Sequence, residues 1–179
     1  MFGLKCVKKS QMKLVICWPK GIRSMLMKGK KILVVGVANQ SSIAWGITES
    51  LIAQGAEVAL TYQNERLAKR VVDLAKSVDP PLPCYEMDAT SPESVAKVFE
   101  KLDKEWGQLD GLVHSIAFAR YADGPCPFHE TRREDFMQAL DVSMFSLVAL
   151  AGALKDRFSP TASVVTMSIP NTRLAWESY

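Results

Sequence analysis

Apolar and polar positions follow two different periods along this chain, and the changes between them mark its strands and helices. Residues 32–37 read ILVVGV, an apolar run rich in β-branched side chains that predicts a strand covered on both faces. Beyond a polar turn that starts at Gly36, apolar residues recur every four positions at Ile43, Ile47 and Leu51. This spacing predicts a helix with one apolar face.

The same alternation of strand and helix continues to a fifth strand. We expect the further strands at residues 57–62, 84–88, 109–119 (with a small-residue exit) and 162–168, and the further helices from about residue 64, from Thr90 and from 132 to 158. Thr90 and Glu93 can form a capping box, and Pro160 is expected to break the last helix. This order predicts an α/β fold with a Rossmann-like, doubly wound parallel sheet over residues 28–168. The pattern fails in residues 169–179, so the sheet is expected to be incomplete after the fifth strand.

Charge is placed unevenly along the chain. Residues 1–31 hold nine lysines or arginines and no acidic residue, whereas the remainder holds thirteen basic and nineteen acidic residues, a net charge of about −6. We expect residues 1–27 to lie outside the fold, as an extension upstream of a natural start at Met25 or Met27; a targeting segment or basic anchor is the alternative. The apolar run at residues 14–18 is too short for a signal peptide or a membrane span.

These charges and the cysteines exclude several classes of function. An acidic domain behind a basic tail gives little support for nucleic-acid binding, and no membrane association is expected. The four cysteines lack the spacing of metal ligands, so we expect no metal site and reduced thiols in a cytoplasmic protein.

The turn after the first predicted strand has the properties of a phosphate site. The first turn of a helix has unpaired N–H groups and a partial positive charge, and a glycine lets an anion approach the backbone. Gly36, Ser42 and Ile43 would form this site. The stretch does not contain the GxGxxG fingerprint of dinucleotide-binding proteins, so a tight strand–helix turn with a serine cap and no ligand remains the alternative.

Other candidate residues follow the remaining strands. Ligands of doubly wound sheets bind beyond the carboxyl ends of the strands, which brings Gln63, Asp88, Ala89 and residues 115–119 to one crevice with Gly36. Many NAD-dependent enzymes carry an acidic residue after the second strand, and NADP-dependent ones often a basic residue. Gln63 can bond ribose hydroxyls but supplies no cation for a 2′-phosphate, which favours NAD.

Each of these residues also has a purely structural interpretation. Gln63 can be an ordinary residue at the start of a helix, with Arg66 close enough to weaken the preference for NAD. Asp88 can be a cap or turn residue. His114 lies in an apolar run, which favours a packed core histidine over a catalytic base.

Four separated stretches, in this order, resemble the NADH-dependent enoyl-acyl-carrier-protein reductases of bacterial fatty-acid synthesis, a divergent branch of the short-chain dehydrogenase/reductases. They read GVANQSSIAWG (36–46), ALTYQNERL (59–67), Asp88-Ala89 and LVHSIAFA (112–119). The resemblance implies that Gly36, Ser42 and Ile43 hold the pyrophosphate region, Gln63 the adenosine ribose, Asp88 and Ala89 the adenine, and Ile116 the nicotinamide side. It places Ala119 beside the acyl substrate.

The resemblance also implies the reaction and the partners. Members of this family transfer hydride from NADH to the β-carbon of a trans-2-enoyl thioester on acyl-carrier protein, an active-site tyrosine stabilises or protonates the enolate, and a lysine holds the nicotinamide ribose. The family typically forms homotetramers.

The resemblance breaks down after the fifth strand. Ile169 stands where the family has a tyrosine after Ser168, Tyr179 has the spacing of the second tyrosine without its flanking residues, and the family lysine would fall beyond Tyr179. We therefore expect a C-terminally truncated member without catalytic residues, poorly folded and with little turnover. A frameshift is one hypothesis for this ending. The alternatives are a non-catalytic NAD-binding module and another short-chain dehydrogenase that acts on a carbonyl.

Overall fold

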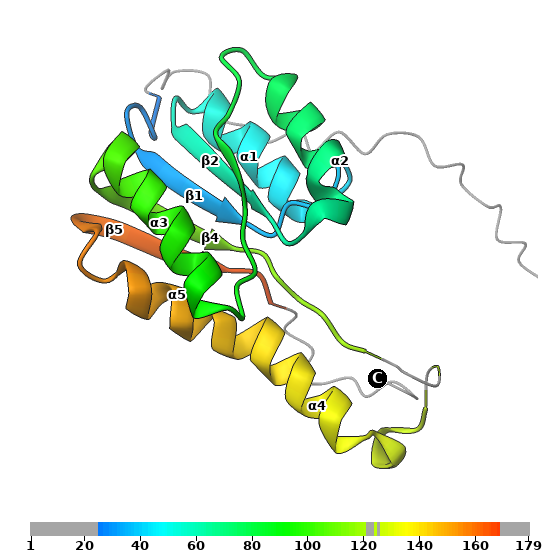
Figure 1. Ribbon diagram of the computed structural model, residues 1–179. Helices are drawn as coiled ribbons and strands as arrows, with labels where there is room; N and C mark the ends of the chain where they lie inside the picture. Colours follow the sequence, from blue (N-terminus) through cyan, green and yellow to red (C-terminus); the bar gives the residue numbers. More distant parts are fainter. Residues whose placement is uncertain (1–24, 121–123, 125, 169–179) are drawn as a thin grey trace, which may run out of the picture.

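A single five-stranded parallel sheet organises the protein (Figure 1). The computed structural model describes residues 25–120, 124 and 126–168. The strands are β1 (Lys31–Val35), β2 (Glu57–Tyr62), β3 (Cys84–Glu86), β4 (Leu109–His114) and β5 (Phe158–Thr166). They lie in the order β3-β2-β1-β4-β5, and every neighbouring pair is parallel. This order confirms the predicted Rossmann-like architecture.

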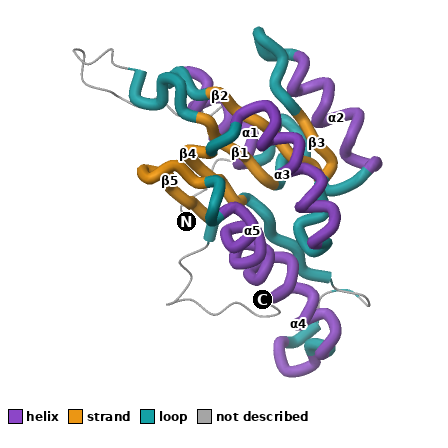
Figure 2. Tube along the Cα trace, turned by 60° about the vertical axis from the view of Figure 1, so that its left-hand side comes forward, coloured by secondary structure: helices purple, strands orange, loops and turns teal. Residues whose placement is uncertain are grey.

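Helices cover both faces of the sheet. The helices are α1 (Ile43–Ala53), α2 (Glu65–Lys76), α3 (Pro92–Trp106), α4 (Arg133–Leu140) and α5 (Ser146–Leu154), with a short 3-10 helix η1 (Phe128–Glu130) and a π-helix η2 (Asp141–Phe145). Helices α1 and α2 pack on one face, whereas α3 and α5 pack on the other. Figure 2 shows α5 beside α3 and α4 extending away from the sheet.

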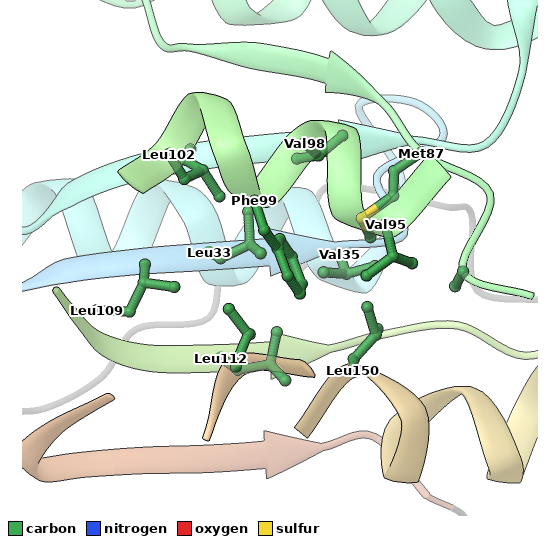
Figure 3. Close-up of a cluster of buried hydrophobic side chains, with 13 residues drawn as sticks. Leu33, Val35, Met87, Val95, Val98, Phe99, Leu102, Leu109, Leu112 and Leu150 are labelled. Atoms are coloured by element: carbon green, nitrogen blue, oxygen red, sulfur yellow. The ribbon is translucent and has the colours of Figure 1, made fainter. Parts of the chain in front are cut away.

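Alternate residues of β1 supply the two cores. Ile32 and Val34 contact the cluster under α1 and α2, and Leu33 and Val35 contact the cluster under α3 and α5. Each strand residue points to the opposite face from its neighbour, so an entirely apolar strand fits only a sheet covered on both faces. In the second cluster, Phe99 of α3 reaches toward the sheet among these side chains (Figure 3).

The core-facing side of α1 is partly the predicted one, because Ile47 and Leu51 pack against the core but Ile43 does not. Ile43 is 64% exposed, and the residues buried against the sheet are Ala44, Trp45 and Thr48. The large Trp45 side chain occupies the space next to β1, which turns the helix so that its first residue points away from the core. The four-residue spacing therefore identified the helix and two of the three residues expected on its core-facing side.

The cap of α3 is also shifted by one residue. Ser91 is the N-cap, and its Oγ accepts a hydrogen bond from the Ser94 amide at 3.2 Å. The Thr90 hydroxyl donates instead to Asp88 Oδ1 at 2.8 Å. Because Pro92 takes the first helical position, where its missing N–H costs nothing, the predicted Thr90–Glu93 capping box is wrong.

The last helix and strand meet earlier in the chain than predicted. The helix ends at Leu154, and β5 begins at Phe158 and runs through Pro160, so Pro160 does not break the helix. A proline is tolerated there because β5 pairs only with β4 among the described strands, with a register shift between Leu109 and Gly111. Strand β2 has the predicted bounds, whereas β1, β3 and β4 end a few residues earlier than predicted.

The helix Arg133–Leu154 is long and apolar. Its 22 residues include an 18-residue window of mean hydropathy 1.6, enough by length and composition to cross a membrane. Only 17% of this window is buried; Leu150 and Leu154, at the end of the helix, are fully buried in the core cluster shared with α3. The expectation of no membrane association stays a prediction.

The domain begins slightly before the predicted boundary at residue 28. Met27 packs against the core under α1, and its amide donates to the Gln54 carbonyl at 3.1 Å. The three residues 25–27 therefore contact the fold, whereas residues 1–24 and 169–179 lie outside the described residues.

Candidate functional site

A pocket of about 150 Å³ opens at the carboxyl ends of the central strands. Its walls come from the turn after β1, the start of α2, the turn after β3, the exit from β4 and the π-helix η2. Five predicted cofactor residues line it: Gly36, Gln63, Asp88, Ala89 and Ile116. Residues separated by up to eighty positions in the sequence thus meet where a doubly wound sheet binds its ligand.

Three predicted residues do not line this pocket. Ser42 is half-buried, and its hydroxyl donates to the Asn39 carbonyl at 2.6 Å. The Ile43 side chain is exposed, and Ala119 is exposed on the segment that follows β4. The roles assigned to these three residues stay predictions.

Gly36, which lines the pocket, makes a close backbone contact with Ser115. Its φ of +99° is a conformation that side chains disfavour, and a Cβ built on it would lie 2.2 Å from the Ser115 carbonyl oxygen. The Ser115 amide donates to the Val35 carbonyl at 2.9 Å, which holds the exit of β4 against the end of β1. Only a glycine fits this close approach of two backbones.

The start of α1 can accept an anion. The helix has no acidic residue in its first turn, and its first amides have no acceptors within the helix. The Ser42 and Ser41 amides donate to Asn39, at 3.1 and 2.8 Å, and the Trp45 and Gly46 amides donate to the Ser42 carbonyl. The donors without a partner among the described residues are therefore the Ile43 and Ala44 amides. This polarity suits a phosphate group.

Gln63 and Asp88 differ in the hydrogen bonds that their side chains already make within the protein. Gln63 is exposed, and its amide has no hydrogen-bond partner in the part of the chain that the structure describes. Asp88 Oδ1 accepts hydrogen bonds from the Thr90 amide at 2.9 Å and the Thr90 hydroxyl at 2.8 Å. Asp88 is therefore a turn residue, as its structural interpretation predicts, while its other oxygen has no partner among the described residues.

His114 is a packed core histidine, as predicted. It is fully buried, with Nε2 2.8 Å from Ser146 Oγ and Nδ1 3.0 Å from Thr166 Oγ1. The Ser146 hydroxyl donates to the Val142 carbonyl, so its oxygen accepts the Nε2 proton and Nδ1 accepts from Thr166. Burial lowers the pKa of this imidazole, which favours the neutral form that both bonds require.

The π-helix η2 contributes a pocket residue that the sequence pattern did not reveal. Val142 lines the pocket, although it lies in the middle of a long apolar helix. The apolar period of this helix continues through the π-turn, so the pattern contains no local signal. Interruptions of this kind are frequent at functional sites.

The structure offers few other candidates. No cluster of three or more histidine, cysteine or acidic side chains that could hold a metal occurs among the described residues. Burial raises the pKa of the Cys84 thiol to about 11, which makes it an unreactive thiol at neutral pH. A larger groove of about 270 Å³ lies between α3 and α5, but of the predicted residues only Ala89 lines it.

The pocket is smaller than a whole dinucleotide requires, because sites for drug-sized ligands typically span about 300–1,000 Å³. A dinucleotide would lie across the strand ends, with one part enclosed and the rest along the surface beside α1. The residues present fit such a ligand, since the glycine turn, the helix start and the unpaired Gln63 amide lie along one edge of the sheet.

Comparison with known proteins identifies close relatives. The family model described as enoyl-(acyl carrier protein) reductase matches residues 36–179, a range that includes the tail 169–179 for which no match was expected. The NADH-dependent enoyl-acyl-carrier-protein reductase of Enterococcus faecalis is 39% identical over 155 residues, which are 87% of this chain and 61% of that protein.

Solved structures agree in fold. The enoyl-acyl-carrier-protein reductase of Anaplasma phagocytophilum in complex with NAD is 36% identical with a TM-score of 0.80, over 87% of this chain and 59% of that one. The Bacillus cereus enzyme with NADP+ and an indole naphthyridinone is 35% identical with a TM-score of 0.80, over 85% and 60%. The chain thus spans about 60% of the length of these relatives.

Proposed function

Because this chain belongs to the enoyl-acyl-carrier-protein reductase family, we propose that its strand-end pocket binds NADH, the cofactor with which the family reduces a trans-2-enoyl thioester carried by acyl-carrier protein. The observation that carries the proposal is the meeting of Gly36, Gln63, Asp88, Ala89 and Ile116 in one pocket. These residues come from separate family motifs, and the fold brings them together at the ligand-binding edge.

The described residues would bind and orient the cofactor. Gly36 and the first turn of α1 would face the pyrophosphate, and the free Gln63 amide the adenosine ribose. The Asp88–Ala89 turn would border the adenine, and Ile116 the nicotinamide end. When bound, the cofactor supplies the hydride; the protein supplies its position.

The preference for NADH over NADPH rests on the charge beside Gln63. Binding of a 2′-phosphate needs a cation, and the Gln63 side chain is neutral. The exposed Arg66 lies nearby, in the first turn of α2. Because the Bacillus cereus relative was solved with NADP+, we expect a difference in affinity between NADH and NADPH and not the exclusion of NADPH.

Family membership supports the proposed substrate, and the exposed apolar side chains of the long helix support the proposed assembly. Ala119, exposed on the β4 exit, would border the acyl chain of the thioester. The homotetramer is supported by the apolar outer side of the long helix, where Met144, Phe145 and Val148 are exposed. A cytoplasmic location completes the proposal.

The alternatives differ in chemistry and can be separated by one paired assay. Titration of the 179-residue chain with NADH, followed by reduction of a crotonyl thioester, tests binding and turnover independently. Binding without turnover is the expected result, since Ile169 occupies the position of a family tyrosine. Turnover of the thioester would contradict that expectation, and turnover of a carbonyl substrate would favour a different dehydrogenase. Absence of NADH binding would refute the proposal.

A further inference from the structure

The long helix changes from α to π geometry for one turn where it passes the pocket. In η2 the amide of Ser146 bonds to the carbonyl of Asp141, five residues earlier, instead of four. A π-turn inserts one extra residue into a helix; such turns are rare and are frequently found at functional sites. This π-turn lies beside the pocket, because Val142 of η2 lines it.

The turn directs neighbouring side chains to different parts of the site. Val142 lines the pocket, and Ser146 accepts the hydrogen bond from His114 at the end of β4. Between them, Ser143 Oγ accepts from the Phe118 amide at 2.9 Å and donates to the Phe118 carbonyl at 3.1 Å. One hydroxyl therefore engages both backbone groups of a single residue.

This contact supplies the backbone hydrogen bonds of a segment that is otherwise held by side chains, since Ile116 packs against the core and Arg120 Nε donates to Asp135 Oδ1 at 2.8 Å. The exit of β4 leaves the sheet after the bond between Ser115 and Val35. In residues 116–119 the two bonds to Ser143 are the only backbone hydrogen bonds formed with the described part of the chain. The Phe118 side chain is 49% exposed, so burial does not anchor it.

We infer that Ser143 is a positioning residue, whose hydroxyl holds the β4 exit so that Ile116 and Ala117 form a wall of the cofactor pocket. The inference rests on the proposed function, because the wall matters only if the pocket binds the cofactor. The π-turn is what allows Ser143 to face Phe118 while Val142 faces the pocket and Ser146 faces His114.

Three variants of the full chain test this role. Ser143→Ala removes both hydrogen bonds, Ser143→Thr retains a hydroxyl, and Ser77→Ala removes an exposed serine that caps only the end of α2. Hydrogen exchange of the Phe118 amide measures the contact with Ser143, and NADH titration measures cofactor binding by the pocket. Thermal unfolding confirms that each variant folds.

Ser143→Ala is expected to speed exchange at Phe118 roughly tenfold and to weaken NADH binding about three- to tenfold, with the loss of two hydrogen bonds as its cause. Ser143→Thr should recover most of both properties, and Ser77→Ala should match the wild type. If Ser143→Ala fails to fold, Ser143→Thr must still bind NADH like the wild type; loss of binding in that folded variant overturns the inference.

The failures of the inference and of the proposed function are distinguishable. Unchanged Phe118 exchange or unchanged NADH affinity in folded Ser143→Ala overturns the inference alone. Absence of NADH binding by the wild type overturns the proposed function, and the positioning role with it, whatever the exchange rate at Phe118.

Discussion

Gly36 and Ser115 approach so closely that a Cβ on Gly36 would stand 2.2 Å from the Ser115 carbonyl oxygen. This contact joins the end of β1 to the exit of β4, two segments that both line the pocket. The shape of the pocket therefore depends on the absence of a side chain at one position.

Gly36→Ala is predicted to destabilise the protein by about 2 kcal/mol or more, because the alanine must adopt a disfavoured φ and displace a backbone carbonyl. NADH binding should be lost with it. Denaturant unfolding and NADH titration measure the two effects. Gly152→Ala is the matched control: it meets no atom within 4 Å, lies in α5, and should be neutral or stabilising by up to about 1 kcal/mol. Equal behaviour of the two variants would show that the close contact is unimportant.

The pH dependence of stability should report on His114. Its pKa is lowered by burial, so the folded state holds fewer protons than the unfolded state below the ordinary value of 6.5. Stability should therefore fall as the pH drops through that value, before the carboxylates titrate. Thermal unfolding between about pH 7.5 and about pH 5.5 measures how steeply the stability changes with pH.

His114→Gln should flatten this slope. Glutamine keeps a donor and an acceptor but does not titrate, so the variant should lose about 1–3 kcal/mol at neutral pH while its unfolding becomes less sensitive to acid. His129→Gln, at an exposed position, is the control and should leave the slope unchanged. A slope that survives in His114→Gln would have to come from other groups.

Asp110 is predicted to matter more than Asp103, although both pair with a basic side chain. Asp110 accepts from Lys30 Nζ at 2.8 Å, the Lys31 amide at 3.0 Å and Ser159 Oγ at 2.9 Å, which ties β1, β4 and β5 together. Asp110→Asn should cost about 1–2 kcal/mol in unfolding free energy. Asp103→Asn removes an Arg157 pair that is about one-third exposed, so about 0.5 kcal/mol is expected.

Acid unfolding tests the role of Asp110 further. The Lys30 hydrogen bond, opposed by desolvation and supported by the other donors, lowers the pKa of Asp110 below its ordinary value of 3.8. The stabilisation from Asp110 is thus present above about pH 4 and is lost as the pH falls through the folded value. Asp110→Asn should reduce the acid sensitivity below about pH 4. Equal acid profiles for the wild type and this variant would contradict the assignment.

Gln63 should control the choice of nicotinamide cofactor. Gln63→Arg adds a cation where the 2′-phosphate of NADPH would lie, and should strengthen NADPH binding relative to NADH roughly tenfold. Arg66→Ala tests whether the neighbouring arginine already contributes. Paired titrations with NADH and NADPH give the ratio of the two affinities. If Gln63→Arg leaves this ratio unchanged, the adenosine ribose does not bind beside Gln63.

Much of the fold follows from local patterns in the sequence. The apolar strand at Ile32–Val35, the turn at Gly36 and the stripe from Val95 to Leu102 each predict an element that the structure contains. Strands that are apolar on both faces need helices on both sides, which leads directly to a doubly wound sheet.

The errors lie where long-range packing decides. Ile43 is exposed because Trp45 takes the place against the sheet, and Pro160 enters β5 because an edge strand does not need every amide. Val142 and Ser143 were not predicted as site residues, because a π-turn leaves the apolar pattern of the helix intact. Family motifs identified the pocket residues, whereas the contact that supports them is visible only in three dimensions.

Hydrogen exchange of the 179-residue chain with and without NADH tests the central claim most directly, because it locates the ligand as well as detecting it. Binding at the strand ends predicts slower exchange at the turn 36–38, the start of α1 and the β4 exit at 115–118, with little change at the opposite ends of the strands. No change on addition of NADH, or protection confined to the groove between α3 and α5, would contradict the assignment of this pocket to the cofactor.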